Sequence, residues 1–340
     1  MSRGLGFGLI SAQRSPGDSR SWTDLYREAL ALTVRAEELG YRSVWTTEHH
    51  FVDDGYMPSL LPMSAAMAAL TSTIEIGTGV VLAPLYHPLR LAEDAATVQL
   101  ISRGRFTLGL GLGWMPVEFE ALGAALDRRG RAMDEILAIL PRAWTGVPFA
   151  HEGDLYQFPA VGVRPVPEHP VPIVIGGGAQ AAVRRAARSA QGFFSNASPA
   201  GLVRQIGWAT DELERTGGDP AAFRWIYYTV MFPGSDPDDA WERGRRHIHA
   251  LHWKYDDMED SASRDGALPE PPPLAEGAEG KLRAATLLGR GSDIAERIEE
   301  IRRAAGIELD IVARSYFPTL SFDQQIEVME QLATEVAPHL

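Results

Sequence analysis

The feature that most constrains the fold of this chain is an alternation that continues along most of its length. Short runs rich in valine, isoleucine and leucine are followed by longer segments in which apolar residues recur every three or four positions. Such runs are typical of parallel strands buried on both faces, and the longer segments are typical of amphipathic crossover helices. The strand-like runs are 4–10, 42–46, 74–83, 105–110, 172–176, 192–195, 223–232 and 307–314.

With about eight such strands, the pattern predicts an α/β fold of the (β/α)8, or TIM-barrel, type. Because no linker divides the chain, we expect a single domain over 1–340. An open doubly wound sheet is the alternative, but it requires a glycine-rich turn after the first strand, and Gly4, Gly6 and Gly8 lie within that strand. Helices are expected at 21–40, 61–71, 88–102, 118–145, 180–190, 199–216 and 323–340.

Two segments interrupt the alternation. Residues 148–170 contain short extended pieces broken by glycine and proline, which predicts a hairpin-like insertion. Residues 256–280 are acidic, contain three consecutive prolines and show no periodicity. Irregular segments of this length are either functional lids or disordered loops, so we expect one of the two here.

Composition excludes several classes of function. The chain has 32 basic and 45 acidic residues, a net charge of −13, which disfavours binding to nucleic acid or to an anionic membrane. No run approaches the roughly 18 apolar residues of a membrane span, and the first strand begins too early to leave room for a secretion signal. We therefore expect a cytoplasmic protein. The absence of cysteine excludes disulfides and thiolate chemistry.

In a barrel of this kind the active site lies where the strands end and their following loops begin. Glu48, His49 and His50 follow the second strand. Neighbouring histidines cannot point the same way on a regular backbone, so one is expected to face the cavity and the other to support it. Histidine transfers protons near neutral pH, and Glu48 is a candidate to fix its tautomer. A metal site and a purely structural role are the alternatives; no third metal ligand is evident, so no metal is predicted.

Glycines follow several other strands. Gly176, Gly177, Gly178 and Ala179 lie between a strand and a helix, so their backbone N–H groups are candidates to bind a phosphate, although a tight turn has the same sequence. Gly111 and Gly113 precede Trp114 and would let a flat ligand approach the backbone, although narrow barrel corners also use glycine.

These motifs together resemble the luciferase-like monooxygenases, a superfamily of flavin- and deazaflavin-dependent enzymes. The resemblance covers nearly the whole chain and is strongest between Gly40 and Gly123. It is carried by Glu48-His49-His50-Phe51 and by residues 77–82, 87–94, 102–106, 172–178 and 336–340. It implies a barrel whose cavity binds a flavin.

The resemblance also implies roles for individual residues. His49 falls on the family's active-site histidine, which Glu48 and His50 would orient. Gly79 and Val80 fall where the family often has a cis peptide behind the flavin ring. Tyr86, Trp114 and a lid formed by 256–280 would cover the substrate. The family's arginine for flavin phosphate is absent, because Gly111 and Leu112 occupy that region; the glycines at 176–178, aided by Arg184, would bind the phosphate instead.

The function implied is a monooxygenase that uses oxygen and reduced FMN, supplied by a separate flavin reductase, to oxidise a small and largely apolar substrate. A homodimer is expected, with the apolar helix at 61–70 as a candidate contact. The first alternative is a hydride-transferring oxidoreductase with a deazaflavin coenzyme. The deazaflavin-dependent branch of the family often has the motif Gly-x-Gly-Trp after the fourth strand, which is similar to Gly111, Gly113 and Trp114 here. The second is a non-catalytic flavin-binding subunit.

Overall fold

The computed structural model describes residues 4–340 and contains a closed barrel of parallel strands. Each strand pairs with its neighbours in the order β1–β2–β3–β5–β8–β9–β10–β12, and β12 pairs with β1 to close the ring. The predicted (β/α)8 barrel is thus confirmed and the open sheet is excluded. The barrel strands are β1 (Leu5–Ile10), β2 (Ser43–Thr46), β3 (Glu75–Thr78), β5 (Phe106–Gly111), β8 (Ile173–Gly176), β9 (Gly192–Ser195), β10 (Arg224–Pro233) and β12 (Asp310–Arg314).

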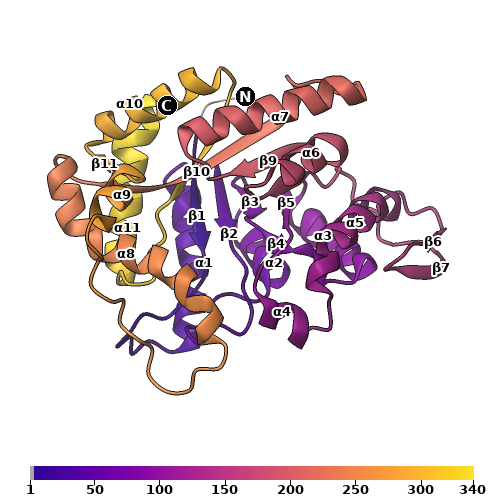
Figure 1. Cartoon of the computed structure of the whole chain (residues 1–340), viewed down its shortest axis with the longest axis horizontal. Coiled ribbons are helices and arrows are strands. Elements are labelled where there is room, and N and C mark those ends of the chain that lie inside the picture. The colour runs from indigo at the N-terminus through magenta and orange to yellow at the C-terminus, as the bar shows by residue number, and fades with distance from the viewer. Residues whose placement is uncertain (1–3) are drawn as a thin grey trace.

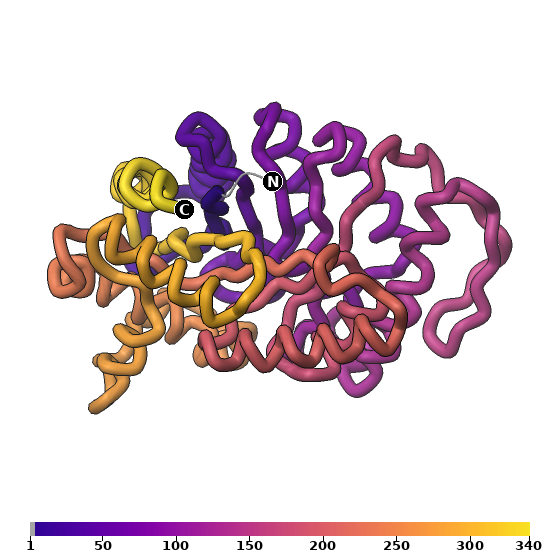
Figure 2. The backbone as a smooth tube through the Cα atoms, turned by 90° about the horizontal axis from the view of Figure 1, so that it is seen from above, coloured from indigo at the N-terminus to yellow at the C-terminus, as the bar shows by residue number. Residues whose placement is uncertain are grey.

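Helices surround the strands, as Figures 1 and 2 show from two directions. Eight of them follow the barrel pattern: α1 (Trp22–Glu38), α2 (Leu60–Leu70), α3 (Pro88–Ser102), α5 (Arg129–Ala143), α6 (Gln180–Ser189), α7 (Pro199–Thr216), α10 (Gly291–Ala305) and α11 (Phe322–Gln331). The additional elements are β4 (Val81–Leu82), α4 (Pro116–Ala121), β6 (Phe149–Glu152), β7 (Gln157–Val161), α8 (Pro237–Ser261), α9 (Ala278–Ala284) and β11 (Leu287–Gly289). β6 and β7 pair antiparallel and lie at the right-hand side of Figure 1.

The structure corrects three expected element boundaries. The single helix predicted for 118–145 is two helices, α4 and α5, separated by a turn in which Gly123 has a φ of +70°. The irregular segment is shorter than 256–280, because α8 continues to Ser261 and α9 begins at Ala278. The terminal helix ends at Gln331, followed by a π turn and a 3-10 turn. The start of the chain, on which the expectation about a secretion signal depends, lies partly outside the described residues.

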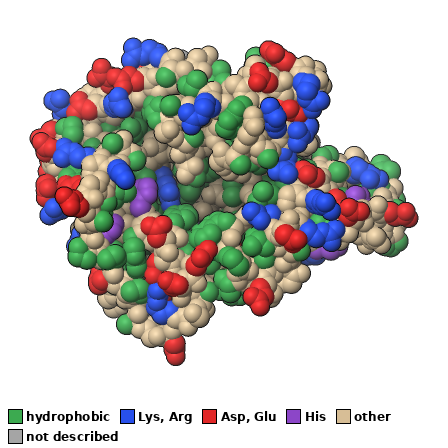
Figure 3. Space-filling model, in the orientation of Figure 1, with side chains coloured by type: hydrophobic (Ala, Val, Ile, Leu, Met, Phe, Trp, Pro, Cys, Tyr) green, Lys and Arg blue, Asp and Glu red, His purple; other side chains and the backbone are tan. Residues whose placement is uncertain are grey.

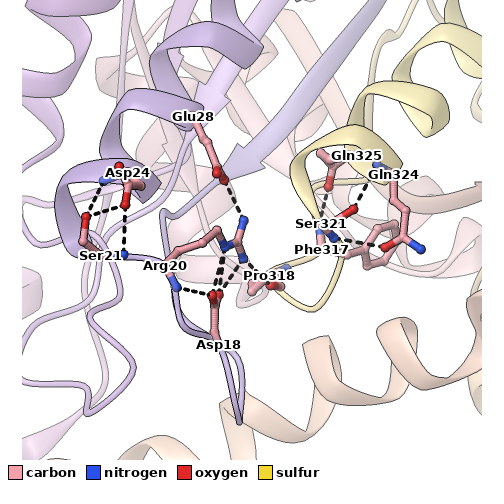
Figure 4. A network of polar contacts seen from close by, with 10 residues as sticks. All are labelled: Asp18, Arg20, Ser21, Asp24, Glu28, Phe317, Pro318, Ser321, Gln324 and Gln325. Carbon is pink, nitrogen blue, oxygen red and sulfur yellow. Dashed lines mark hydrogen bonds and ion pairs between the residues drawn. The ribbon is translucent and has the colours of Figure 1, made fainter.

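Polar contacts lie at the amino ends of the first and last helices, where the loop after β1 approaches the segment after β12 (Figure 4). Ser21 and Asp24 form a capping box that begins α1, and Ser321 and Gln324 form one that begins α11. Such boxes satisfy backbone N–H groups that have no partner within the helix. Arg20 lies between them: it pairs with Asp18 and Glu28 at 2.6 Å each and donates a hydrogen bond of 3.5 Å to the carbonyl of Pro318. This network fixes the loop after β1 against the segment after β12.

The barrel interior is filled in layers. At the amino ends of the strands, Arg224 pairs with Glu75 and Asp310, each at 2.6 Å. Above them lies an apolar cluster whose upper members contact the cavity: it comprises Leu9, Trp45, Val174, Phe194, Ile226 and Val312, with Val80 and Tyr228 packed against it. Because this layer closes the barrel, space for a ligand remains only at the carboxyl ends of the strands.

Candidate active site

A cavity of about 1070 Å³, part of it open to solvent, lies at the carboxyl ends of the barrel strands. The face drawn in Figure 3 is hollowed near its centre, with hydrophobic side chains along the lower edge of the hollow. Residues from seven of the barrel's strand ends and from α8 line the cavity: Leu9, Thr47, Glu48, His49, Gly79, Val80, Leu82, Gly111, Leu112, Gly113, Trp114, Gly176, Gly177, Gly178, Ala179, Ala182, Phe194, Tyr228 and Tyr255. The lining includes nearly every residue proposed from the sequence; His50 and Tyr86 lie outside it.

His49 is the histidine of the pair that faces the cavity. Its side chain is 6% exposed, and Nδ1 lies 3.1 Å from Oε1 of Glu118, a fully buried residue of α4. The same carboxylate oxygen accepts a hydrogen bond of 2.8 Å from the backbone N–H of His50. In the neutral ring, the carboxylate places the hydrogen on Nδ1 and leaves Nε2 as the acceptor. His49 therefore has a fixed orientation, and its Nε2 has no hydrogen-bond partner among the described residues 4–340.

Glu48 does not orient His49, and this part of the sequence interpretation is wrong. Its carboxylate accepts hydrogen bonds from the backbone N–H of Leu82 at 2.6 Å and from the hydroxyl of Tyr86 at 2.5 Å. His50 Nε2 lies 3.5 Å from the same carboxylate, beyond a good hydrogen bond, and has no other partner within residues 4–340. Burial, followed by the charge of Glu48, raises the pKa of Tyr86, so its hydroxyl remains a donor. Glu48 thus fixes the loop after β3 to the loop after β2.

The glycines at the end of β8 form a cradle at the start of α6. Gly176 to Ala179 line the cavity, and no side chain caps the amino end of α6, so its first backbone N–H groups are free to meet an anion. Gly177 has a φ of +147°, a conformation that favours glycine. Arg184 does not contribute here, because its guanidinium faces Glu212 on α7 at 3.8 Å. The expected help from Arg184 is therefore absent in this structure.

The side chain of Val80 requires glycine at two neighbouring positions. A Cβ atom at Gly111 would lie 2.4 Å from Val80, and one at Gly176 would lie 2.9 Å from it. Both glycines therefore make room for the Val80 side chain at the floor of the cavity. The Gly79–Val80 peptide bond is cis, as the resemblance implies, and so is Gly8–Leu9, which the sequence did not indicate.

An aromatic wall stands beside His49. The rings of Tyr56, Trp114 and Tyr255 lie 5.0, 5.9 and 5.9 Å from the His49 ring, all edge to face. The Tyr56 hydroxyl donates to Thr47 at 3.2 Å and lies 3.1 Å from the Tyr255 hydroxyl. Trp114 is 39% exposed at the mouth of the cavity, whereas Tyr86 lines a separate neighbouring pocket.

A buried charge cluster holds α8 over this wall. Lys254 of α8 pairs with Asp53 at 2.6 Å and with Asp257 at 3.1 Å, and Arg264 pairs with the same two carboxylates. Asp53 belongs to the loop after β2 that also carries His49. The cluster therefore connects the start of the irregular segment to the loop after β2.

Glu118 is a site residue that the sequence analysis missed. It lies 69 residues from His49 in the chain and belonged to an expected helix with no assigned role. The sequence offered one signal for the short helix that carries Glu118: Pro116 occupies its first turn, and proline often begins a helix.

Within residues 4–340, no group of three or more histidine and acidic residues has an arrangement that could hold a metal ion. No helix in that part of the chain is both long and apolar enough to cross a membrane.

Sequence comparison relates this chain to known enzymes. The family model of luciferase-like monooxygenases matches residues 5–309. The oxygenase component of flavin-dependent trigonelline monooxygenase from Acinetobacter baylyi is 31% identical over 163 residues, 47% of this chain and 45% of that protein. An F420-dependent glucose-6-phosphate dehydrogenase from Amycolatopsis mediterranei is 31% identical over 175 residues, 49% of this chain and 53% of that protein. The chain spans about half the length of these curated relatives.

Structural comparison supports the same fold. The crystal structure of the monooxygenase RslO1 from Streptomyces bottropensis superimposes with a TM-score of 0.84 over 100% of this chain and 99% of that one. The two sequences are 23% identical, so the likeness concerns the fold alone. The relatives include both flavin-dependent and F420-dependent enzymes, and F420 is a deazaflavin.

Proposed function

The chain belongs to the luciferase-like monooxygenase family, and from this premise we propose that it is a monooxygenase that uses reduced FMN and oxygen to oxidise a small organic substrate. A separate flavin reductase would supply the reduced FMN, and the protein would work in the cytoplasm. The barrel would hold the flavin at the carboxyl ends of its strands, where residues 48–50, 79–80 and 176–179 meet. When bound, reduced FMN supplies the electrons that activate oxygen.

The observation that carries this proposal is the orientation of His49. Glu118 holds Nδ1 at 3.1 Å, and the free Nε2 is the nitrogen available to a group in a cavity lined mainly by apolar side chains and glycine backbone. An imidazole held in this way can donate or accept a proton while the surrounding apolar surface excludes water. Glu48 and His50 would act indirectly, by fixing the loops on which His49 and Val80 lie.

The residues present fit a flavin. The uncapped amino end of α6 offers backbone N–H groups to a phosphate, and Gly178 has no neighbouring atom within 4 Å of a would-be Cβ. Val80, Phe194 and Tyr228 offer an apolar surface to a flat ring system. Gly79, Gly111, Gly113 and Trp114 would surround that ring, and Tyr86 would act through Glu48 rather than by touching the substrate.

The test is formation of the oxidised product from small ketones and aldehydes supplied with reduced FMN and oxygen, because free reduced FMN consumes oxygen without the enzyme. His49→Ala should lower turnover by roughly 10²- to 10⁴-fold, the range for loss of a general acid–base group, while FMN still binds. His151→Ala is a matched control, because His151 forms a similar pair with Glu135 at 3.1 Å but lies on the β6–β7 hairpin. Unchanged turnover in His49→Ala would remove this residue from the mechanism.

A deazaflavin-dependent hydride transfer is the second candidate. The observation that favours it is that no arginine is among the residues of 4–340 that line the cavity: Gly111 and Leu112 occupy the end of β5, and Arg184 faces Glu212. A homodimer is also part of the proposal. Leu70 of α2 and Ile101 of α3 are 53% and 41% exposed on neighbouring helices, and light scattering of the purified protein would test this contact through Leu70→Glu.

A further inference from the structure

Arg314 is a buried arginine at the mouth of the barrel. It is the last residue of β12, is 9% exposed, and pairs in register with Gly8 of β1 and Val230 of β10. Alternate residues of a strand point to the same face. Asp310 and Val312 of the same strand belong to the lower and middle layers of the barrel interior, so Arg314 faces inward one step above them, at the level of the cavity.

Arg314 differs from the other buried arginines in its partners. Of the three buried arginines in residues 4–340, Arg185 pairs with Asp134 at 2.6 Å and Arg302 pairs with Glu299 at 2.5 Å. No carboxylate of that part of the chain lies within ion-pair distance of Arg314. Its guanidinium instead lies 5.1 Å from the centre of the Tyr255 ring. Removing a charge from water without a counter-charge costs several kcal/mol, which an incoming anion would offset.

The groups around Arg314 are neutral. Burial raises the pKa of Tyr228 to about 12, and burial also raises the pKa of Tyr56 well above its usual value. Burial and then the charge of Arg314 lower the pKa of His252 to about 4. Near neutral pH, therefore, neither these phenols nor this imidazole supplies an ionic partner. Tyr228 and Tyr255 both line the cavity, and Arg314, which is not itself among the lining residues, lies next to the Tyr255 ring behind this part of the wall.

We propose that Arg314 binds a carboxylate of the substrate, and that the substrates are small organic acids with an apolar body. The planar guanidinium can hold a carboxylate through two parallel hydrogen bonds, and the hydroxyl of Tyr255 can donate a third. The apolar body would then extend towards His49, because Tyr255 lies beside both residues. This inference rests on the proposed function only in taking the cavity as the substrate site.

The test is a binding screen on the cofactor-free protein. Small aliphatic and aromatic monocarboxylic acids are compared with their primary amides by thermal shift, and the best pair is then measured by calorimetry. An acid should bind roughly tenfold or more tightly than its amide, because a charged hydrogen bond replaces a neutral one. Arg314→Met should abolish that preference, whereas Arg297→Met, which removes an exposed arginine of α10, should retain it. Equal binding of acids and amides to the wild-type protein overturns the inference, as does a preference that survives in Arg314→Met.

Two further measurements keep the result decisive. If Arg314→Met does not fold, Arg314→Lys keeps the charge without the planar fork, and the acid should bind it roughly threefold to tenfold more weakly than the wild type; unchanged affinity would overturn the inference. Binding of reduced FMN is measured on the same proteins. Absence of FMN binding with an intact acid preference contradicts the proposed function alone, and FMN binding without an acid preference contradicts the role of Arg314 alone.

Discussion

Replacing Glu118 by glutamine is the perturbation that most directly separates the orientation of His49 from its presence. Glutamine has nearly the same size and still accepts a hydrogen bond from the backbone N–H of His50, now 2.8 Å from the carboxylate. It cannot balance a positive charge on His49. A hydrogen bond to a charged group stabilises by about 1.5–3 kcal/mol and a neutral one by about 0.5–1.5, so the loss is roughly 1–2 kcal/mol.

That loss corresponds to a fall in turnover of roughly 5- to 30-fold if His49 carries the proton in the slow step. Stability should fall as well. Oε2 of Glu118 is buried without a partner, and an amide group there would be an unsatisfied donor that costs about 1–3 kcal/mol. Turnover is measured by formation of the oxidised substrate with saturating reduced FMN and oxygen, and stability by urea unfolding. Glu120→Gln, an exposed position of the same helix, is the control. Turnover of Glu118→Gln within twofold of the wild type would refute the reasoning.

Three more predictions concern stability. Lys254→Met should lower the free energy of unfolding by about 3–5 kcal/mol in urea titrations, because Asp53 and Asp257 lose a buried counter-charge; a loss below about 1 kcal/mol would contradict the charge cluster. Burial and then the charge of Arg246 lower the pKa of His247 from its usual 6.5 to about 4 in the folded protein. Because the unfolded chain binds the proton more readily, the contribution of neutral His247 to the free energy of unfolding is complete above pH 6.5 and is lost as the pH falls towards 4. His247→Gln should therefore flatten the stability profile in that window, and an unchanged slope would count against this assignment. Gly177→Ala should destabilise by about 1–3 kcal/mol, since φ there is +147°. Gly178→Ala, with open space around it, should leave thermal stability nearly unchanged, and equal effects would argue against strain at Gly177.

The sequence was sufficient for the barrel because parallel strands buried on both faces have a distinctive apolar pattern. The long helix α8 had no such pattern, since its inward face includes Gly244, His247 and Lys254 as well as apolar residues. A pattern based on hydrophobicity alone does not detect a helix whose buried positions are charged or small.

The candidate site was predictable in part for a related reason. Residues that directly follow a strand share one end of the barrel whatever the loops do, so His49 and the glycine cradle could be placed together from sequence. Glu118 and Arg314 required the structure. The contact of Glu118 depends on the path of the loop after β5, and the lack of a carboxylate partner for Arg314 within residues 4–340 depends on how the elements around β12 pack.

The measurement that tests the central claim most directly is a titration of the purified protein with reduced FMN and, separately, with reduced F420. The account predicts tight binding of reduced FMN, weakened by Gly177→Ala at the amino end of α6 and retained in His49→Ala. It also predicts that the FMN-bound wild type consumes oxygen with a small organic substrate. Tight binding of reduced F420 alone, with no affinity for reduced FMN, would contradict the monooxygenase assignment and establish the deazaflavin alternative.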